Sequence, residues 1–204
     1  RALARAIAAA DLVIGYIDGD IGLSAEFARA WSIAADHDLP RVLLIDRSIS
    51  GRADFDEVVA IAQRTLGDDV LTRYLPLAND DGQSLAGIFD VLRNHVITAD
   101  GVRSGDPEHV AHTSEVRAEL MDSLAHLGLP DHALDRHLSG NPVSVPALAN
   151  SWFGDFVVGA LPVDGGIAAD TLLEWLQARQ SRWMPVVLDG DIAIDACDFG
   201  DTVG

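Results

Sequence analysis

The residues best suited to chemistry in this chain stand side by side at Asp46 and Arg47. They follow a continuous apolar run, residues 42–45, whose length and β-branched and leucine side chains predict a strand buried on both faces. In doubly wound α/β sheets, ligands bind beyond the carboxyl ends of the strands. Asp46 and Arg47 are therefore the first candidates for a ligand-binding site. The simpler alternative is a polar turn closed by an ion pair.

Two further groups suggest metal binding, and both have simpler interpretations. Asp18 and Asp20 follow another apolar run, but they offer too few oxygens for a calcium loop, so a strand-to-helix turn is favoured. His109 and His112 lie beside Glu108 without the i, i+4 spacing of the zinc-protease signature. We expect no metal site and assign no catalytic residue to this chain.

The composition excludes several chemistries. All 14 basic residues are Arg, so the chain holds neither a Walker-type phosphate loop nor a lysine Schiff base, both of which need Lys. The 32 acidic residues give a formal net charge of −18, which disfavours binding to duplex nucleic acid or to an anionic membrane. Because Cys197 is the only cysteine, no intrachain disulfide can form, and we expect a cytoplasmic protein.

The elements around Asp46 and Arg47 alternate between strand and helix. Apolar runs predict strands at residues 12–17 and 42–45. Amphipathic periodicity predicts one helix from Ser24, its N-cap, to about His37, and a second over residues 53–66 with Gly67 as its stop. This rhythm is typical of βαβ units in a parallel sheet.

The pattern changes near residue 70 and later returns. Residues 70–77 look extended, residues 87–92 are short and apolar, and the Gly-, Asp-, Pro- and Ser-rich residues 98–113 predict a surface loop. Later segments predict helices at 114–127, 130–138, 145–153 and 167–178, and strands at 156–158, 185–188 and 192–194. We therefore expect an α/β domain interrupted by a mixed insertion.

Several patches of sequence resemble the translational GTPases, above all elongation factor G. Residues 42–45, followed by Asp46-Arg47-Ser48-Ile49 and then by residues 52–56, are similar to the guanine-specificity strand, its Asn-Lys-x-Asp motif and the segment after it. Residues 157–161 with Gly166-Ile167 resemble the strand and Gly-Ser-Ala-Leu loop on the other side of the guanine. Further patches that resemble the family, in the same order, are residues 10–14 with Trp31, 75–77, 87–92, 117–122 and 138–140.

The resemblance implies a P-loop-GTPase-like parallel sheet flanked by helices and interrupted by an α+β inserted subdomain. Residues 1–70 and 154–180 would form the second half of the GTPase domain, residues 71–153 the insertion, and residues 181–204 the start of a following β domain. Because the sequence opens with Arg1 inside a helix-like run, we interpret the chain as a fragment. GTP or GDP with Mg²⁺ would then be bound mostly by residues upstream, and the ribosome would be the partner.

The resemblance assigns nucleotide binding to Asp46, Arg47, Gly159, Ala160 and Leu161. Asp46 takes the place of the family's Asn, Arg47 that of its Lys, and Ile49 that of the Asp that accepts hydrogen bonds from guanine. In the second motif, Ala160 falls on the Ser and Leu161 on the Ala. A buried donor left without its acceptor costs about 1–3 kcal/mol, so we predict weak or poorly base-selective binding.

Three functional hypotheses stay open on the sequence alone. The first is an elongation factor G-like translation factor that binds GTP and hydrolyses it on the ribosome, with a degenerate guanine pocket. The second is a non-hydrolysing paralogue that serves as a ribosome- or protein-binding module. The third is an unrelated flavodoxin-like or Rossmann-like domain, which predicts no inserted subdomain.

Overall fold

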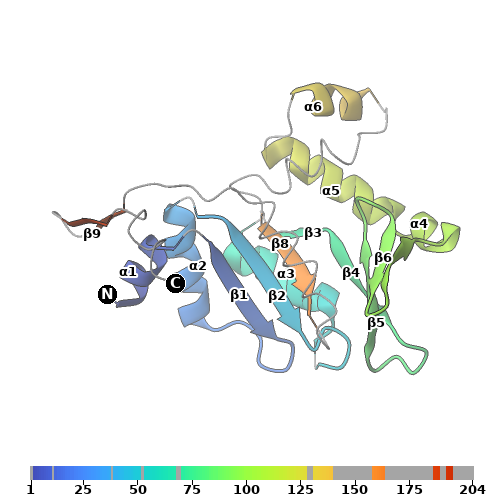
Figure 1. Cartoon of the computed structure of the whole chain (residues 1–204), viewed down its shortest axis with the longest axis horizontal. Coiled ribbons are helices and arrows are strands. Elements are labelled where there is room, and N and C mark those ends of the chain that lie inside the picture. Colours follow the sequence, from blue (N-terminus) through green and yellow to red (C-terminus); the bar gives the residue numbers. More distant parts are fainter. Residues whose placement is uncertain are drawn as a thin grey trace, which may run out of the picture.

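The computed structural model describes residues 2–10, 12–37, 39–51, 53–67, 70–127, 131–139, 158–163, 186–188 and 192–194 (Figure 1). Some sequence predictions lie outside these residues. They are the helices at 145–153 and 167–178, the first two residues of the strand at 156–158, and Gly166-Ile167.

One sheet is entirely parallel and carries Asp46. Its strands are β1 (Val13–Asp18), β2 (Arg41–Asp46), β8 (Val158–Pro162) and β3 (Val70–Thr72), in the order β1-β2-β8-β3. The register of β1 against β2 runs from Val13↔Arg41 to Asp18↔Asp46, so both strands end at the same level.

Two helices cover one face of this sheet, and their capping residues follow from the sequence. Helix α2 (Ala25–Asp36) starts after Ser24, whose Oγ accepts a 3.1 Å hydrogen bond from the Phe27 N–H, as predicted. Helix α3 (Phe55–Leu66) starts after Asp54, whose carboxylate accepts a 2.9 Å hydrogen bond from Glu57, and it ends at Gly67. The apolar faces of the helices join the sheet in one buried cluster: Ile17, Trp31, Leu43, Ile45, Phe55, Val58, Val59, Ala62, Val70 and Ala160.

A second sheet is inserted in the sequence between β3 and β8. It is antiparallel, with strands β4 (Tyr74–Ala78), β5 (Leu85–Asp90), β6 (His95–Thr98) and β7 (Gly101–Ser104) in sequence order. Helices α4 (Pro107–His112), α5 (Ser114–Leu127) and α6 (Asp131–Leu138) follow (Figure 1). The predicted α/β fold with an α+β insertion is confirmed, and the hypothesis of a domain without an insertion is not supported.

The insertion packs on the other face of the parallel sheet. Alternate residues of a strand point to opposite faces, so Val42 and Leu43 belong to different clusters. The Val42 side joins Leu71 and Leu161 of the parallel sheet to Ile88, Phe89, Leu120 and Leu124 of the insertion. The two sheets therefore share one continuous apolar core.

One prediction needs correction. Residues 98–113 are not a surface loop, because they include β7 and α4. The residues that suggested a loop form the tight turn before Gly101 and the helix start, where Pro107 loses no intrahelical hydrogen bond. The extended character predicted for residues 70–77 is confirmed, and it is divided at Arg73 between β3 of the parallel sheet and β4 of the antiparallel sheet.

The remaining described elements are α1 (Ala2–Ala8) and an antiparallel pair, β9 (Val186–Leu188) with β10 (Ile192–Ile194). This pair confirms the strands predicted near the end of the chain. Among the described helices, none has both the length and the hydropathy needed to cross a membrane.

Candidate functional site at the carboxyl edge of the parallel sheet

The loops that follow β1 and β2 lie in backbone contact. The Gly19 N–H donates a 3.0 Å hydrogen bond to the Asp46 carbonyl, and the Gly51 N–H donates a 2.9 Å bond to the Arg47 carbonyl. A Cβ at Gly51 would lie 2.7 Å from the Arg47 carbonyl oxygen and 3.1 Å from the Gly19 carbonyl carbon. Only glycine fits between the two loops, so the edge that carries Asp46 and Arg47 is closely packed.

Both carboxylate oxygens of Asp46 accept hydrogen bonds from within the chain. The Tyr16 hydroxyl, on β1, donates to Oδ2, and the Arg47 backbone N–H donates to Oδ1 at 2.8 Å. The hydrogen bond to Asp46, followed by desolvation and the negative charges of Asp46 and Asp18, raises the pKa of Tyr16 to about 12. Tyr16 therefore stays a protonated donor at neutral pH.

The Arg47 side chain pairs with two carboxylates, one from Asp18 at the end of β1 and one from Asp20 in the turn after it. Its Nη1 lies 2.6 Å from Asp20 Oδ2, and its Nε lies 3.8 Å from Asp18 Oδ2. Its φ of 53° is in the left-handed region, which is uncommon for a residue other than glycine. The Arg47 side chain is 52% exposed, so the ion pairs orient it more than they stabilise the fold.

The two residues after Arg47 turn into the protein. Ser48 is buried, and its carbonyl accepts a 3.0 Å hydrogen bond from the Phe55 N–H at the start of α3. Ile49 packs against the apolar core that the parallel sheet shares with the insertion. Ile49 therefore contributes apolar packing to this core.

The three predicted site residues on β8 lie beside β2 but not at its carboxyl end. The register pairs Val42 with Gly159 and Leu44 with Leu161, and both Ala160 and Leu161 are buried. The carboxyl end is reached at Val163, whose N–H donates a 3.0 Å hydrogen bond to the Ile45 carbonyl. The structure brings Asp46 and Arg47 together and places Gly159, Ala160 and Leu161 further back in the sheet. Their nucleotide binding stays a prediction.

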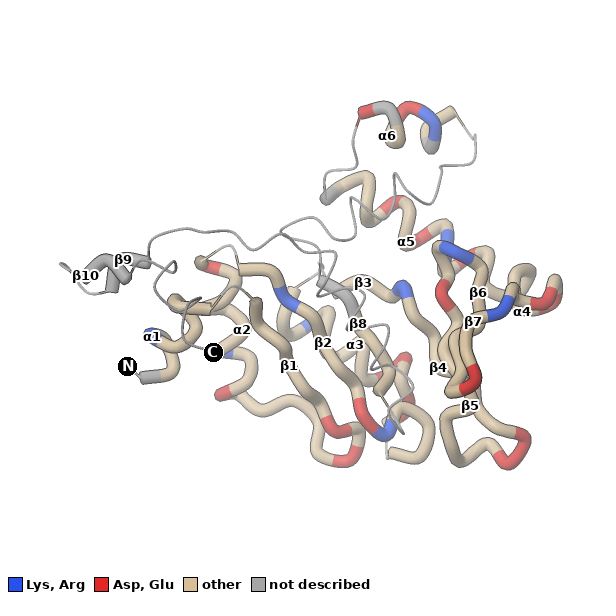
Figure 2. Tube along the Cα trace, in the orientation of Figure 1, with Lys and Arg blue, Asp and Glu red and all other residues tan. Residues whose placement is uncertain are grey.

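Sequence reasoning missed Tyr16, although one signal could have found it. The signal was the parallel pairing of two predicted strands that both end in an aspartate, Asp18 and Asp46, because this pairing brings Tyr16 near the end of the neighbouring strand. The resulting edge is acidic, with Asp18, Asp20 and Asp46 around Arg47. Figure 2 shows these charges gathered where β1 and β2 end. Among the described residues, no cluster of three or more His, Cys, Asp or Glu could hold a metal ion.

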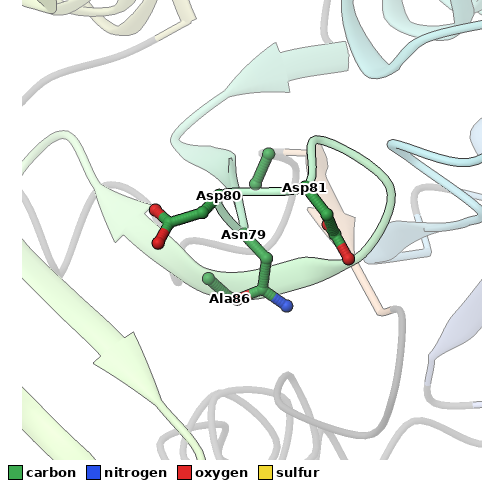
Figure 3. A pocket seen from close by; sticks show the side chains of 5 residues that line it. Asn79, Asp80, Asp81 and Ala86 are labelled. Carbon is green, nitrogen blue, oxygen red and sulfur yellow. The ribbon is translucent and has the colours of Figure 1, made fainter.

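A separate hollow of about 430 Å³ lies at the turn between β4 and β5. Figure 3 shows Asn79, Asp80, Asp81 and Ala86 around it, and Ala78 completes the lining. The Asn79 amide donates a 2.7 Å hydrogen bond to Ser84 Oγ, which closes the turn. The hollow shares no residue with the predicted nucleotide site.

Comparisons with known proteins find distant relatives among elongation factors G and mitochondrial ribosome-releasing factors 2. The chain is 26% identical over 164 residues to elongation factor G of Anaplasma marginale (strain Florida), covering 76% of this chain and 23% of the relative. It is 30% identical over 138 residues to the mitochondrial ribosome-releasing factor 2 of Drosophila grimshawi, covering 64% of this chain and 18% of the relative. No protein-family model matches the sequence.

A crystal structure of a Thermus thermophilus protein shares the fold. The TM-score is 0.70 at 23% identity, with 88% of this chain and 28% of that chain covered. The chain is thus distantly homologous, over most of its length, to elongation factor G and mitochondrial ribosome-releasing factor 2, which confirms the resemblance. It spans only 18–23% of the length of the curated relatives named above.

Proposed function

We propose that this chain forms the base-binding side of a guanine-nucleotide domain in an elongation factor G-like translation factor that acts on the ribosome in the cytoplasm. The homology and the position of Asp46 and Arg47 at the carboxyl edge of the sheet support this function. In this proposal the domain comprises residues 1–70 and 154–180, with residues 71–153 inserted and residues 181–204 opening a β domain.

The residues present fit a nucleotide only in part. Arg47 offers a planar guanidinium on which a base can stack. Gly159, Ala160 and Leu161 are part of β8, the strand that pairs with β2 and leads to the edge. The chain has no lysine for the phosphates, so in this proposal the phosphates and Mg²⁺ are held outside its residues. Any hydrolysis would depend on those groups, and no catalytic residue is assigned here.

The arrangement of Ile49 and Asp46 carries the proposal of a degenerate guanine pocket. Ile49 packs into the core and offers no acceptor to a base, while both Asp46 oxygens already accept hydrogen bonds from Tyr16 and Arg47. Guanine donors would lack their partners, so guanine loses its advantage over adenine. The same observation favours a second candidate, a non-hydrolysing ribosome- or protein-binding module, because the edge is satisfied without a ligand.

Nucleotide binding distinguishes the two candidates. The protein, expressed from its complete reading frame, is titrated with fluorescent GTP and ATP analogues and sedimented with ribosomes. Comparable, weak affinities for GTP and ATP support the degenerate pocket, whereas tight binding of GTP alone contradicts it. Ribosome binding that is unchanged by any nucleotide supports the binding module, and strict dependence on GTP excludes it.

A substitution at Ile49 tests the base preference directly. Ile49→Asp restores a carboxylate acceptor, so the preference for GTP over ATP should rise by about tenfold or more. Ile21→Asp is the matched control, because Ile21 is exposed and its replacement by Asp adds the same charge to the neighbouring loop. Since Ile49 also packs on the core, thermal unfolding of each variant is measured in parallel. An unchanged preference in a folded Ile49→Asp protein counts against a base site at this edge.

A further inference from the structure

Arg73 is the residue that joins the two sheets, because it lies between the last residue of β3 and the first of β4. Its side chain is fully buried and forms an ion pair with Asp90, the last residue of β5, which is also buried. Nη2 lies 2.7 Å from Oδ2 and Nε lies 3.1 Å from Oδ1. Two parallel hydrogen bonds of this kind fix the relative orientation of both planar groups.

Asp90 and the turn after it, residues 91–93, connect the Arg73–Asp90 ion pair to helix α5. The Asp90 carboxylate also accepts hydrogen bonds from the Leu92 and Arg93 N–H groups, at 3.0 and 3.2 Å. The Val91 N–H donates a 2.9 Å hydrogen bond to the Arg73 carbonyl. From α5, Arg117 Nη1 donates to the carbonyls of Val91 and Leu92, at 2.6 and 2.7 Å. The turn is therefore hydrogen-bonded to Arg73 and Asp90 on one side and to Arg117 of α5 on the other.

Stability alone does not explain a buried ion pair at this position. The apolar core already binds the two sheets together, and apolar contact has no preferred direction. Desolvation offsets most of the attraction in a buried pair, so its replacement by apolar side chains is often neutral for stability. The pair adds to the apolar contact a fixed orientation of Arg73 relative to Asp90, and so of the segments that carry them.

We infer that the Arg73–Asp90 pair is an orientation lock, which holds the antiparallel sheet and α5 at one angle on the parallel sheet. A partner bound to the inserted elements would then stand at a fixed position relative to the edge that carries Asp46. This inference does not depend on which ligand that edge binds.

The test uses the complete chain with Cys197→Ser and spin labels at Arg29→Cys on α2 and Glu119→Cys on α5, both exposed positions. Pulsed electron paramagnetic resonance gives the distribution of distances between the labels. In Arg73→Met and Asp90→Asn, each single change strands a buried charge and should lower Tm by about 10 °C, while Asn keeps an oxygen acceptor for the Leu92 and Arg93 N–H groups. The double variant should regain a Tm within about 3 °C of the parent. Its distance distribution should nevertheless become at least about twice as broad, because apolar contact gives no preferred direction.

Arg103→Met is the control, because Arg103 pairs with Asp106 at 3.4 Å on the exposed surface of the same insertion. It should change neither Tm nor the distribution. A folded double variant with the parent's narrow distribution would overturn the lock. A double variant as unstable as the singles would also overturn it, since the pair would then act through stability. If the single variants do not fold, the double variant decides alone, because it buries no charge.

Discussion

Asp46 differs from an ordinary carboxylate at the end of a strand, because its two oxygens accept hydrogen bonds from Tyr16 and from the Arg47 backbone. Arg47 in turn reaches back to Asp20 and Asp18. Each polar group thereby fixes the next, and the network ties the ends of β1 and β2 together. A ligand at this edge must either use the outer surface of the network or displace one of its members.

The Tyr16–Asp46 hydrogen bond gives a prediction that needs no ligand. Asp46→Asn removes the charged acceptor, so the pKa of Tyr16 should fall from about 12 toward its ordinary value of 10.0. Absorbance at 295 nm follows phenol ionisation with pH. Subtracting the curve of Tyr16→Phe isolates Tyr16 from Tyr74, the only other tyrosine. A pKa of Tyr16 that does not move in Asp46→Asn would show that Asp46 is not the partner.

The same hydrogen bond links stability to alkaline pH. The pKa of Tyr16 is higher in the folded chain than its ordinary value, so folding favours the protonated phenol. The contribution is complete below about pH 10 and is lost as the pH rises from 10 toward 12. Urea unfolding at a series of alkaline pH values should show a steeper loss of stability for the parent than for Tyr16→Phe. Parallel curves would contradict the linkage.

At the scale of elements, the contact between β1 and α2 depends on a glycine. A Cβ at Gly15 would lie 2.6 Å from Phe27 Cζ and 2.7 Å from Trp31 Cζ3, two rings that stack on each other. Gly15→Ala should therefore lower the free energy of unfolding by about 1–3 kcal/mol. Urea unfolding measures this, and in a Phe27→Leu background the loss should be smaller, because the nearest ring atom is gone. An equal loss in both backgrounds would exclude Phe27 as the cause and leave the contact with Trp31.

Helix α3 tests how much one capping residue contributes to the site's framework. Asp54→Ala removes the acceptor for the Glu57 N–H and should cost about 1 kcal/mol of unfolding free energy. Asp54→Ser keeps an acceptor and is the matched control, expected to stay close to the parent. Equal losses in both variants would show that the carboxylate acts through charge alone and not as a cap.

The elements that the sequence predicted well are those with local signals. Ser24, Gly67 and the apolar periodicities fixed α2 and α3, and the short apolar runs fixed β1 and β2. The stretch 98–113 was predicted wrongly because β7 is exposed along its whole length and so carries no alternating pattern. The position of Asp46 and Arg47 at the end of β2 was predicted because they directly follow a buried run. Tyr16 was missed because its partner is 30 residues away and becomes its neighbour only through strand pairing.

At the scale of the whole molecule, the two sheets are one body with a shared core and a buried polar joint. In the parallel sheet, β8 lies between β2 and β3, although the inserted residues separate β3 from β8 in the sequence. The insertion packs on this sheet, so separating the two would expose the shared apolar core. Sequence reasoning placed the insertion from changes of pattern. It could not find the Arg73–Asp90 pair, because nothing local to either residue indicates that the two meet inside the core.

The charge of the chain leads to a prediction about salt. With 32 acidic and 14 basic residues, the folded chain concentrates a formal net charge of −18, and an acidic edge formed by Asp18, Asp20 and Asp46 adds local repulsion. Unfolding separates these charges, and salt screens them over about 10 Å at 0.1 M. The free energy of unfolding, measured by urea titration, should therefore rise between 10 mM and 500 mM NaCl. Because sulfate also strengthens apolar burial, chloride is the correct salt, and an equal ionic strength of Na₂SO₄ serves as the comparison. A fall in stability with NaCl would contradict this prediction. It would mean that attraction in ion pairs such as Arg47–Asp20 contributes more to the free energy of unfolding than the net repulsion removes.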